Sequence, residues 1–362
     1  MNTLEAWLCL KSAPKLKIGA IHAILEKYPD PGEFVGTKDH PLQADESLDP
    51  QTREHLANAV QHPDLDTILE LSSRYDIKAT FFGAEDYPEG LYYITMPPLI
   101  LYYRGELEPA VDEICLGVVG TRKATAYGKA SCKKLLEPVC RLGATIVSGL
   151  ATGIDTAAHT AALNVGGKTI AVLASGLQTI YPPQNQKLAE TIIANGALVS
   201  EYEPGTPIEP WQFVTRNRII SGLSTAVFIV EGSHKSGAMI TAKHAIDQNR
   251  EIMALPGPIN HPNSQGPNYL IKNGALCVTE ADDIIQVLDL DTQSDDQLDI
   301  LPPMSPSEQQ VHHIFQTQQR EISFDELLML TKFSFGQLST ALLNLELKGY
   351  LCKTGGNSFI LS

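Results

Sequence analysis

Between Ile114 and Leu288, short apolar segments alternate with glycine-containing turns and helical segments, and this alternation constrains the fold more than any other feature. Segments of this length and composition, each followed by a helix, are typical of parallel strands buried on both faces. The sequence therefore predicts an α/β fold with a Rossmann-like parallel sheet covered by helices. The expected strands are Ile114–Val119, Ala144–Val147, Lys168–Ala174, Ala197–Ser200, Thr225–Val230, Glu251–Leu255 and Ala275–Val278.

Right-handed crossovers place all the strand-to-helix turns at one edge of such a sheet, where ligands bind. The central turn runs from Ser148 to Asp155, where two glycines lead into a helix that begins near Thr156. Exposed amides at a helix N-terminus can hold a phosphate, although glycines in one such turn can serve geometry alone. Several turns of this kind favour anion binding, and Asp155 is expected to cap its helix.

The segments on either side of the sheet predict further domains. Residues 1–75 have helical periodicity and predict a small domain of the SAM or helix-hairpin-helix type, and residues 76–113 are expected to add a strand or two to the sheet edge. The Rossmann-like domain is therefore placed at 76–288. An acidic linker at 289–306 and a winged helix at 307–362 are expected to follow.

The charge of the chain is uneven. The net charge is −15, but residues 116–288 contain 14 Lys and Arg against 12 Asp and Glu, so the acidity lies in the flanks. The presumptive recognition helix Phe335–Lys348 has Lys348 as its one basic residue. Since duplex binding rests largely on phosphate neutralisation, protein contact or a vestigial role is favoured for the winged helix.

Composition indicates an ordinary globular protein of the cytoplasm. The six cysteines are scattered without a CxxC pair, which is typical of buried thiols in a reducing compartment and gives no indication of a metal site. No apolar run approaches the roughly 18 residues that span a bilayer. The N-terminus also lacks the basic and apolar regions of a secretory signal.

The turns expected at the ligand edge combine glycines with cations. Five basic residues belong to this group, and together with turn amides they indicate anion recognition. These five residues are Arg122, Lys123, Arg216, Arg218 and Lys235.

The spacing of the motifs excludes several common nucleotide sites. The first turn lacks GxGxxG spacing, and neither a P-loop nor a GxSxG nucleophile motif occurs. His159 and His244 lie within predicted helices, where packing is favoured, and no carboxylate pair stands out. The sequence therefore predicts a binding protein without catalytic residues, metal or cofactor, whose site fits a phosphate chain.

Six motifs, in order along the chain, resemble those of the DNA-processing protein A family (DprA, also called Smf). They are Gly120-Thr121-Arg122, Ser148 to His159, Tyr181 to Asn185, Arg216 to Ser224, Ser236 to Ala242 and Leu255-Pro256-Gly257.

The resemblance implies a dimer that binds single-stranded DNA and loads the RecA recombinase onto it during DNA uptake and natural transformation. The candidate DNA-contact residues are Gly120, Thr121, Arg122, Ser148, Gly149, Gly153, Asn185, Arg216, Asn217, Arg218, Lys235, Ser236 and Gly237.

Two alternatives remain open at this stage. A nucleotide-processing enzyme related to the phosphoribohydrolases has a similar sheet, but its glycine-rich turn carries a catalytic glutamate that is missing from Glu231–Gly237. An adaptor that joins RecA to other proteins without binding DNA is the other alternative.

Overall fold

A computed structural model describes residues 2–16, 18–59, 62–111, 114–290, 304–318, 320–348, 350–353 and 358–361. The chain divides into two compact units, Met1–Asp291 and Thr292–Ser362, and each is described by itself.

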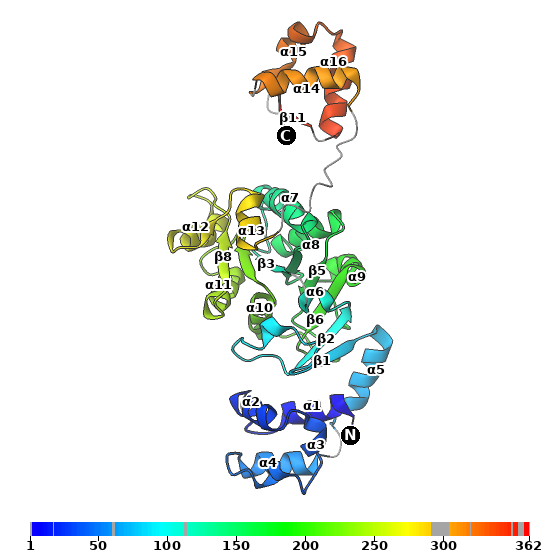
Figure 1. Cartoon of the computed structure of the whole chain (residues 1–362), viewed down its shortest axis with the longest axis vertical. Coiled ribbons are helices and arrows are strands. Elements are labelled where there is room, and N and C mark those ends of the chain that lie inside the picture. The colour runs from blue at the N-terminus through cyan, green and yellow to red at the C-terminus, as the bar shows by residue number, and fades with distance from the viewer. Residues whose placement is uncertain are drawn as a thin grey trace. The chain divides into compact units, whose positions relative to one another are not determined.

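A nine-stranded sheet forms the centre of the first unit, within the residues described (Figure 1). Its order is β1-β2-β6-β5-β4-β3-β7-β8-β9. The seven strands numbered β3 to β9 run parallel to one another, and β1 and β2 are added antiparallel at one edge. All seven predicted strands are present, and residues 76–113 contribute the two expected edge strands. The strands are β1 (Lys78–Phe81), β2 (Ile100–Gly105), β3 (Cys115–Val119), β4 (Thr145–Ser148), β5 (Thr169–Val172), β6 (Gly196–Ser200), β7 (Ala226–Ile229), β8 (Glu251–Ala254) and β9 (Leu276–Cys277).

Helices cover both faces of this sheet, as the alternation of apolar strands requires. Ile146 of β4 packs with α7, α8 and α13 on one face, whereas its neighbour Val147 packs with α10, α11 and α12 on the other. The α/β Rossmann-like prediction is confirmed. The helices are α6 (Glu108–Val111), α7 (Ala126–Arg141), α8 (Ile154–Asn164), α9 (Gln186–Ala194), α10 (Pro210–Gly222), α11 (Gly237–Asp247), α12 (Gln265–Lys272) and α13 (Ala281–Val287).

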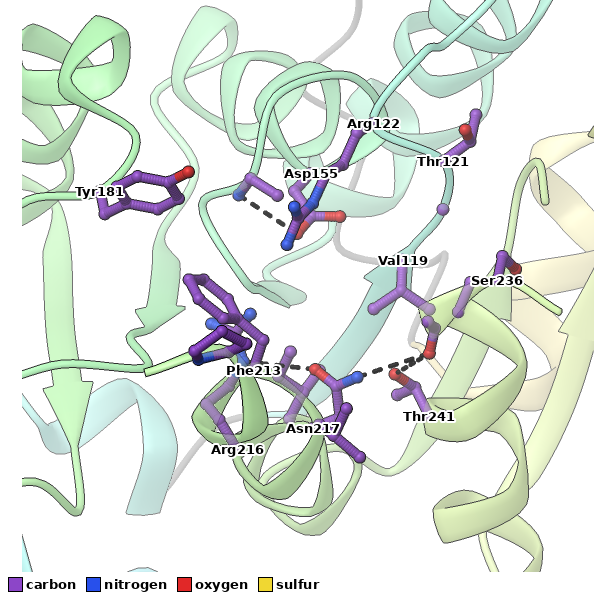
Figure 2. Close-up of a pocket in the computed structure, with 17 residues that line it drawn as sticks. Val119, Thr121, Arg122, Asp155, Tyr181, Phe213, Arg216, Asn217, Ser236 and Thr241 are labelled. Atoms are coloured by element: carbon purple, nitrogen blue, oxygen red, sulfur yellow. Dashed lines mark hydrogen bonds between the residues drawn. The ribbon is translucent and has the colours of Figure 1, made fainter. Parts of the chain in front are cut away.

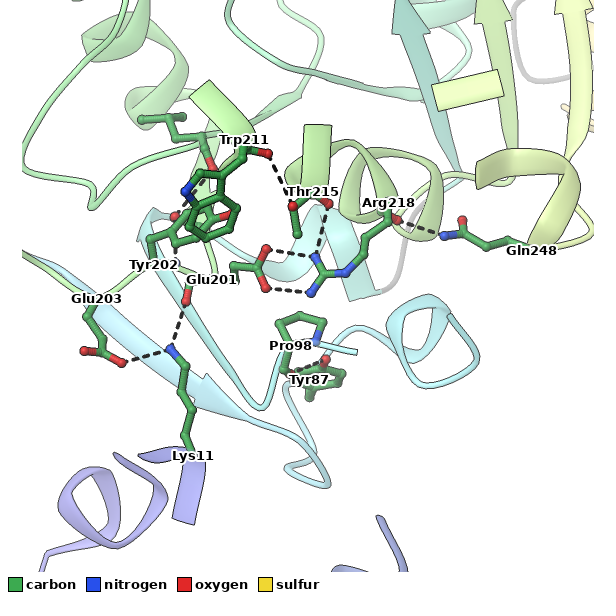
Figure 3. Close-up of polar contacts among 12 residues, drawn as sticks. Lys11, Tyr87, Pro98, Glu201, Tyr202, Glu203, Trp211, Thr215, Arg218 and Gln248 are labelled. Carbon is green, nitrogen blue, oxygen red and sulfur yellow. Dashed lines mark hydrogen bonds and ion pairs between the residues drawn. The ribbon is translucent and has the colours of Figure 1, made fainter. Parts of the chain in front are cut away.

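The first 75 residues are helical, as predicted, and they share an apolar core with the sheet edge. The ring of Trp7 stacks on Phe81 of β1 with centroids 5.5 Å apart. Lys11 Nζ donates to Glu203 Oε1 at 2.9 Å beyond the end of β6 (Figure 3). The domain boundary at residue 75 stays a prediction. The helices are α1 (Thr3–Ser12), α2 (Ile18–Lys27), α3 (Pro31–Phe34), α4 (Pro50–Asn58) and α5 (Leu65–Tyr75).

The second unit contains the helices and the strands expected of residues 307–362. Val311, Phe315, Leu327 and Leu345 contribute to its own apolar core. The winged-helix assignment stays a prediction, and most of the predicted linker at 289–306 lies outside the described residues. The elements are α14 (Pro306–Gln318), β10 (Ile322–Ser323), α15 (Phe324–Thr331), α16 (Phe335–Leu347), β11 (Leu351–Lys353) and β12 (Ser358–Leu361).

Candidate nucleic-acid interface

A cleft of about 600 Å³ opens at the carboxyl ends of the parallel strands (Figure 2). The chain leaves β3 toward β4 on one side, and β7 returns on the other side of β3. In open α/β sheets, ligands bind at this reversal of strand order. The cleft is lined by Val119, Gly120, Thr121, Arg122, Ala151, Asp155, Tyr181, Pro210, Phe213, Val214, Arg216, Asn217, Ile220, Ser236, Gly237, Ala238 and Thr241.

One wall of the cleft combines a cation with two aromatic rings. The exposed guanidinium of Arg122 lies over the ring of Phe213, 5.2 Å from its centroid. Phe213 in turn meets Tyr181 edge to face at 5.6 Å, and Tyr181 is 44% exposed. These groups also border a smaller hollow of about 230 Å³. A cation beside aromatic faces suits a ligand that contains both phosphate and bases.

The first and second turns are held against each other by Gly153. This residue has a φ of +88°, and a Cβ there would come within 2.3 Å of the Thr121 carbonyl oxygen. The Ile154 amide donates to that same oxygen at 3.2 Å. Glycine is therefore required sterically, and it brings Arg122 next to the start of α8.

Asp155 lies in the first turn of α8, and the expected capping position is wrong by two residues, since Gly153 precedes the helix. Its Oδ2 accepts from the Ala151 amide at 3.3 Å, which closes the turn before the helix. Burial raises the pKa of Asp155 to about 6, although the charge of Arg216 acts in the opposite direction. The cleft therefore has a protonatable carboxyl at its floor.

The prediction that Arg216, Asn217 and Arg218 lie on a turn is wrong, because all three are inside α10. Arg216 is buried beneath the cleft, where its guanidinium donates to the carbonyl oxygens of Val172 and, at 3.0 Å, Gly149. It thus ties the ends of β4 and β5 to α10. Burial lowers the pKa of Arg216 to about 10.

Asn217 lies beside Arg216 at the floor of the cleft (Figure 2). Its Oδ1 accepts from Arg216 Nε at 3.3 Å, and its amide nitrogen donates to the Gly237 carbonyl at 3.4 Å. Asn217 therefore connects the buried arginine to the start of α11.

Arg218 does not present a free cation to the cleft. It is 5% exposed and forms a bidentate ion pair with Glu201, with N–O distances of 2.9 and 2.6 Å (Figure 3). Such paired geometry is typical of a structural arginine. Sequence spacing could not distinguish Arg218 from Arg122, because residue type is the same and only the packing of α10 differs.

Three other predicted site residues support the turns from below. Ser148 is fully buried and its hydroxyl donates to the Val118 carbonyl at 2.6 Å. The side-chain amide of Asn185 donates to the Leu150 carbonyl at 2.7 Å. Gly149 is held by Arg216 through its own carbonyl. These groups fix the backbone of the central turn.

The start of α11 supplies the opposite wall. Ser236 and Gly237 line the cleft at the N-terminus of this helix, and the preceding Lys235 is exposed. Lys123, which follows Arg122 in the first turn, is also exposed. Arg122, Lys123 and Lys235 are therefore the predicted cations that remain accessible, together with a helix N-terminus.

The packing predicted for the histidines holds for His159, which is buried and pairs its Nδ1 with the Thr169 hydroxyl at 2.7 Å. Burial lowers its pKa to about 3. His244 is part of α11 and does not line the cleft. Across the described ranges, His, Cys, Asp and Glu form no cluster able to hold a metal ion.

A family model described as DNA recombination-mediator protein A matches residues 78–289. The chain belongs to this family. It is 41% identical over 235 residues to DNA processing protein DprA of Bacillus subtilis, covering 64% of this chain and 79% of the relative. It is 46% identical over 206 residues to protein Smf of Escherichia coli, covering 57% and 55%.

Two solved structures share the fold. DNA processing protein A from Streptococcus pneumoniae superposes with a TM-score of 0.66 at 30% identity, covering 78% of this chain and 97% of that one. The second structure describes the single-stranded DNA binding mode of DNA processing protein A from Helicobacter pylori. Its TM-score is 0.54 at 31% identity, with 60% and 97% covered.

The family shown by these comparisons is the one that the six motifs predicted. Its members bear the names of DNA-processing and recombination-mediator proteins, which agrees with a binding role. Within the residues described, no helix has the length and apolar character needed to cross a membrane.

Proposed function

We propose that this protein binds single-stranded DNA in the cleft at the carboxyl edge of its sheet. The observation that carries the proposal is the exposed Arg122 guanidinium, held 5.2 Å above Phe213 at the mouth of the cleft. A phosphate can pair with the free side of the guanidinium while a base enters beside Tyr181.

Backbone segments on both sides line the rest of this proposed site. Gly120 and Thr121 line the cleft on one side, and Ser236 and Gly237 line it at the start of α11 on the other. Arg216 and Asn217 form its floor, and Lys123 and Lys235 extend the positive charge along the sheet edge. Because the contacts are to backbone phosphate, binding is sequence-tolerant and weakens with salt.

We further propose that a homodimer delivers the bound strand to the RecA recombinase during DNA uptake, in the cytoplasm. The family resemblance supports this role, and a single strand is the form of DNA on which a recombinase filament assembles. Light scattering of the purified protein, and RecA filament assembly on strands covered by single-strand-binding protein, test the two parts separately.

A nucleotide-processing activity has less support. Asp155 is the one carboxylate among the residues that line the cleft, and it accepts an amide within its own turn. The neighbouring Arg216 donates to backbone carbonyls and is fully committed to the fold.

Replacement of Arg122 by alanine tests the site. The Arg122→Ala variant should bind fluorescein-labelled oligo-dT roughly 10- to 150-fold more weakly in anisotropy titrations, since a charge-assisted contact contributes about 1.5–3 kcal/mol. The dependence of log K on log salt should also become shallower by about 0.7 for one lost phosphate contact.

Lys133→Ala is the matched control, because Lys133 is an exposed cation in the middle of α7 and does not line the cleft. This control should retain the wild-type affinity and salt slope. Equal weakening in both variants would show that Arg122 acts only through net charge and would remove it from the site.

A further inference from the structure

Glu231 occupies the point of the sheet where nucleotide-binding α/β proteins hold a phosphate. It lies two residues beyond the end of β7, and β7 lies beside β3 at the reversal of strand order. The residue is 4% exposed. Its backbone is fixed as well, since the Thr121 amide donates to the Glu231 carbonyl at 2.7 Å.

The carboxylate of Glu231 binds the N-terminus of α7, the helix that follows the first strand of the parallel set. One carboxylate oxygen, Oε2, accepts from the Thr125 amide at 2.9 Å, and the other, Oε1, accepts from the Thr125 hydroxyl at 2.5 Å. Thr125 is the N-cap residue of α7, a helix of 16 residues. Amide and dipole there would equally favour a phosphate oxygen.

A glycine in the first turn of α7 lets the carboxylate come this close. A Cβ on Gly128 would lie 2.6 Å from Glu231 Oε2, which no side chain tolerates. In dinucleotide-binding folds, a glycine lets the backbone approach the pyrophosphate of the ligand. At Gly128 the group that approaches is the Glu231 carboxylate of the protein itself.

Open space reaches this carboxylate from outside. A hollow of about 560 Å³ is lined by Thr125, Tyr127, Glu231, Pro256 and His261, among others. None of the residues that line it also lines the cleft that contains Arg122. A free phosphate can therefore reach the N-terminus of α7 once the carboxylate is removed.

We propose that Glu231 determines specificity by filling the phosphate position at the start of α7. It excludes inorganic phosphate and the phosphates of free nucleotides from the N-terminus of α7. Single-stranded DNA is left to bind in the neighbouring cleft, a part of the statement that rests on the proposed function above. The excluded ligands are thus small phosphate compounds, and the group that excludes them is the Glu231 carboxylate.

The test compares wild type, Glu231→Ala and Glu231→Gln by thermal unfolding in sodium phosphate and in sodium chloride of equal ionic strength. Phosphate stabilises folded proteins in general by its exclusion from their surface, so the Tm difference of wild type between the two salts is the reference. The Tm difference of Glu231→Ala should exceed this reference by about 2 °C or more, because a ligand that binds only the native state stabilises it. The double variant Arg122→Ala/Glu231→Ala should keep this response, which places the phosphate at α7 and outside the cleft.

An equal phosphate response in wild type and Glu231→Ala would overturn the proposal, as would the absence of a response in a folded Glu231→Ala. If Glu231→Ala does not fold, Glu231→Ser carries the test, because it also vacates the position of the carboxylate. Its phosphate response must then exceed that of wild type, and equality contradicts the proposal. Glu231→Gln keeps the position filled, so its response should stay at the wild-type level. Oligo-dT binding by wild type, measured in parallel, reports on the proposed function independently.

Discussion

Asp155 and Arg216 show how charged residues at a cleft can hold the backbone around it in place. Both side chains are buried. Burial raises the pKa of Asp155 and lowers the pKa of Arg216, so it favours the neutral form of each. Arg216 holds the carbonyls of Gly149 and Val172, and Asp155 holds the Ala151 amide. The turn between β4 and α8 is thus held from both sides before any ligand arrives.

The raised pKa of Asp155 predicts a specific pH dependence of stability. The native carboxyl, with its pKa of about 6, binds its proton more tightly than the unfolded one, whose pKa is near 4. The stabilisation of the native state by the protonated Asp155 carboxyl is fully present below pH 4 and is lost as the pH rises through 6. Relative to Asp155→Asn, wild type should therefore lose about 2–3 kcal/mol of unfolding free energy over this range.

Urea unfolding of both proteins at several pH values between 4 and 7.5 measures this difference. Comparison with the Asp155→Asn variant cancels the titration of other groups. A constant difference between the two proteins across that range would show that the carboxyl of Asp155 keeps its ordinary pKa.

At the scale of elements, α10 decides which arginines are accessible. It lies under the cleft, and the residues from Arg216 to Gly222 are all buried. Arg216 points toward the ends of β4 and β5, while Arg218 pairs with Glu201 after β6. Two arginines that lie two positions apart in one motif therefore have different structural partners.

Arg218→Ala should consequently affect stability, whereas Arg122→Ala should affect the affinity for DNA. Loss of Arg218 leaves Glu201 without its partner and should lower the unfolding free energy by about 3 kcal/mol, with oligo-dT affinity kept below the new Tm. Arg122→Ala should leave the Tm unchanged and weaken oligo-dT binding. Thermal unfolding and anisotropy on the same preparations distinguish the two, and loss of affinity without loss of stability in Arg218→Ala would return this residue to the interface.

The strands and helices of the sheet could be predicted from sequence because each follows from local pattern. All seven expected parallel strands occur within one or two residues of their predicted bounds. The environment of a side chain does not follow from local pattern. Arg216 and Arg218 have the residue type of an anion site, but α10 is buried around most of its circumference, so no polar face indicated which side chains reach solvent.

Neither Phe213 nor Glu231 was predicted as a site residue, and the two omissions have related causes. Phe213 reaches the cleft from the second turn of α10, and its one signal in the sequence is an aromatic residue close before the Arg216–Arg218 motif. Glu231 follows a predicted strand, which places it at the ligand edge. Its partner Thr125 is 106 residues away, so only the fold brings the two together.

At the scale of the whole molecule, the cleft and the second unit are built from different stretches of chain. All residues that line the cleft fall between Val119 and Thr241, inside the part matched by the family model. Residues 304–361 have an apolar core of their own. The proposed binding site is therefore contained in the first unit.

A chain that ends at Leu290 should therefore fold and bind oligo-dT with the affinity of the full-length protein. Circular dichroism, thermal unfolding and anisotropy titrations check the two parts of this statement. A large loss of affinity in a folded truncated protein would assign part of the interface to the second unit.

We propose that the cleft at the sheet edge binds single strands through their phosphate backbone. Mobility-shift titrations of the wild-type protein with a single-stranded oligonucleotide and its duplex, each at low and moderate salt, distinguish this binding mode from the alternatives. We predict tighter binding of the single strand at both salt concentrations, with an affinity that falls as salt rises. Equal affinity for both forms, or single-strand binding that is unaffected by salt, would contradict the account.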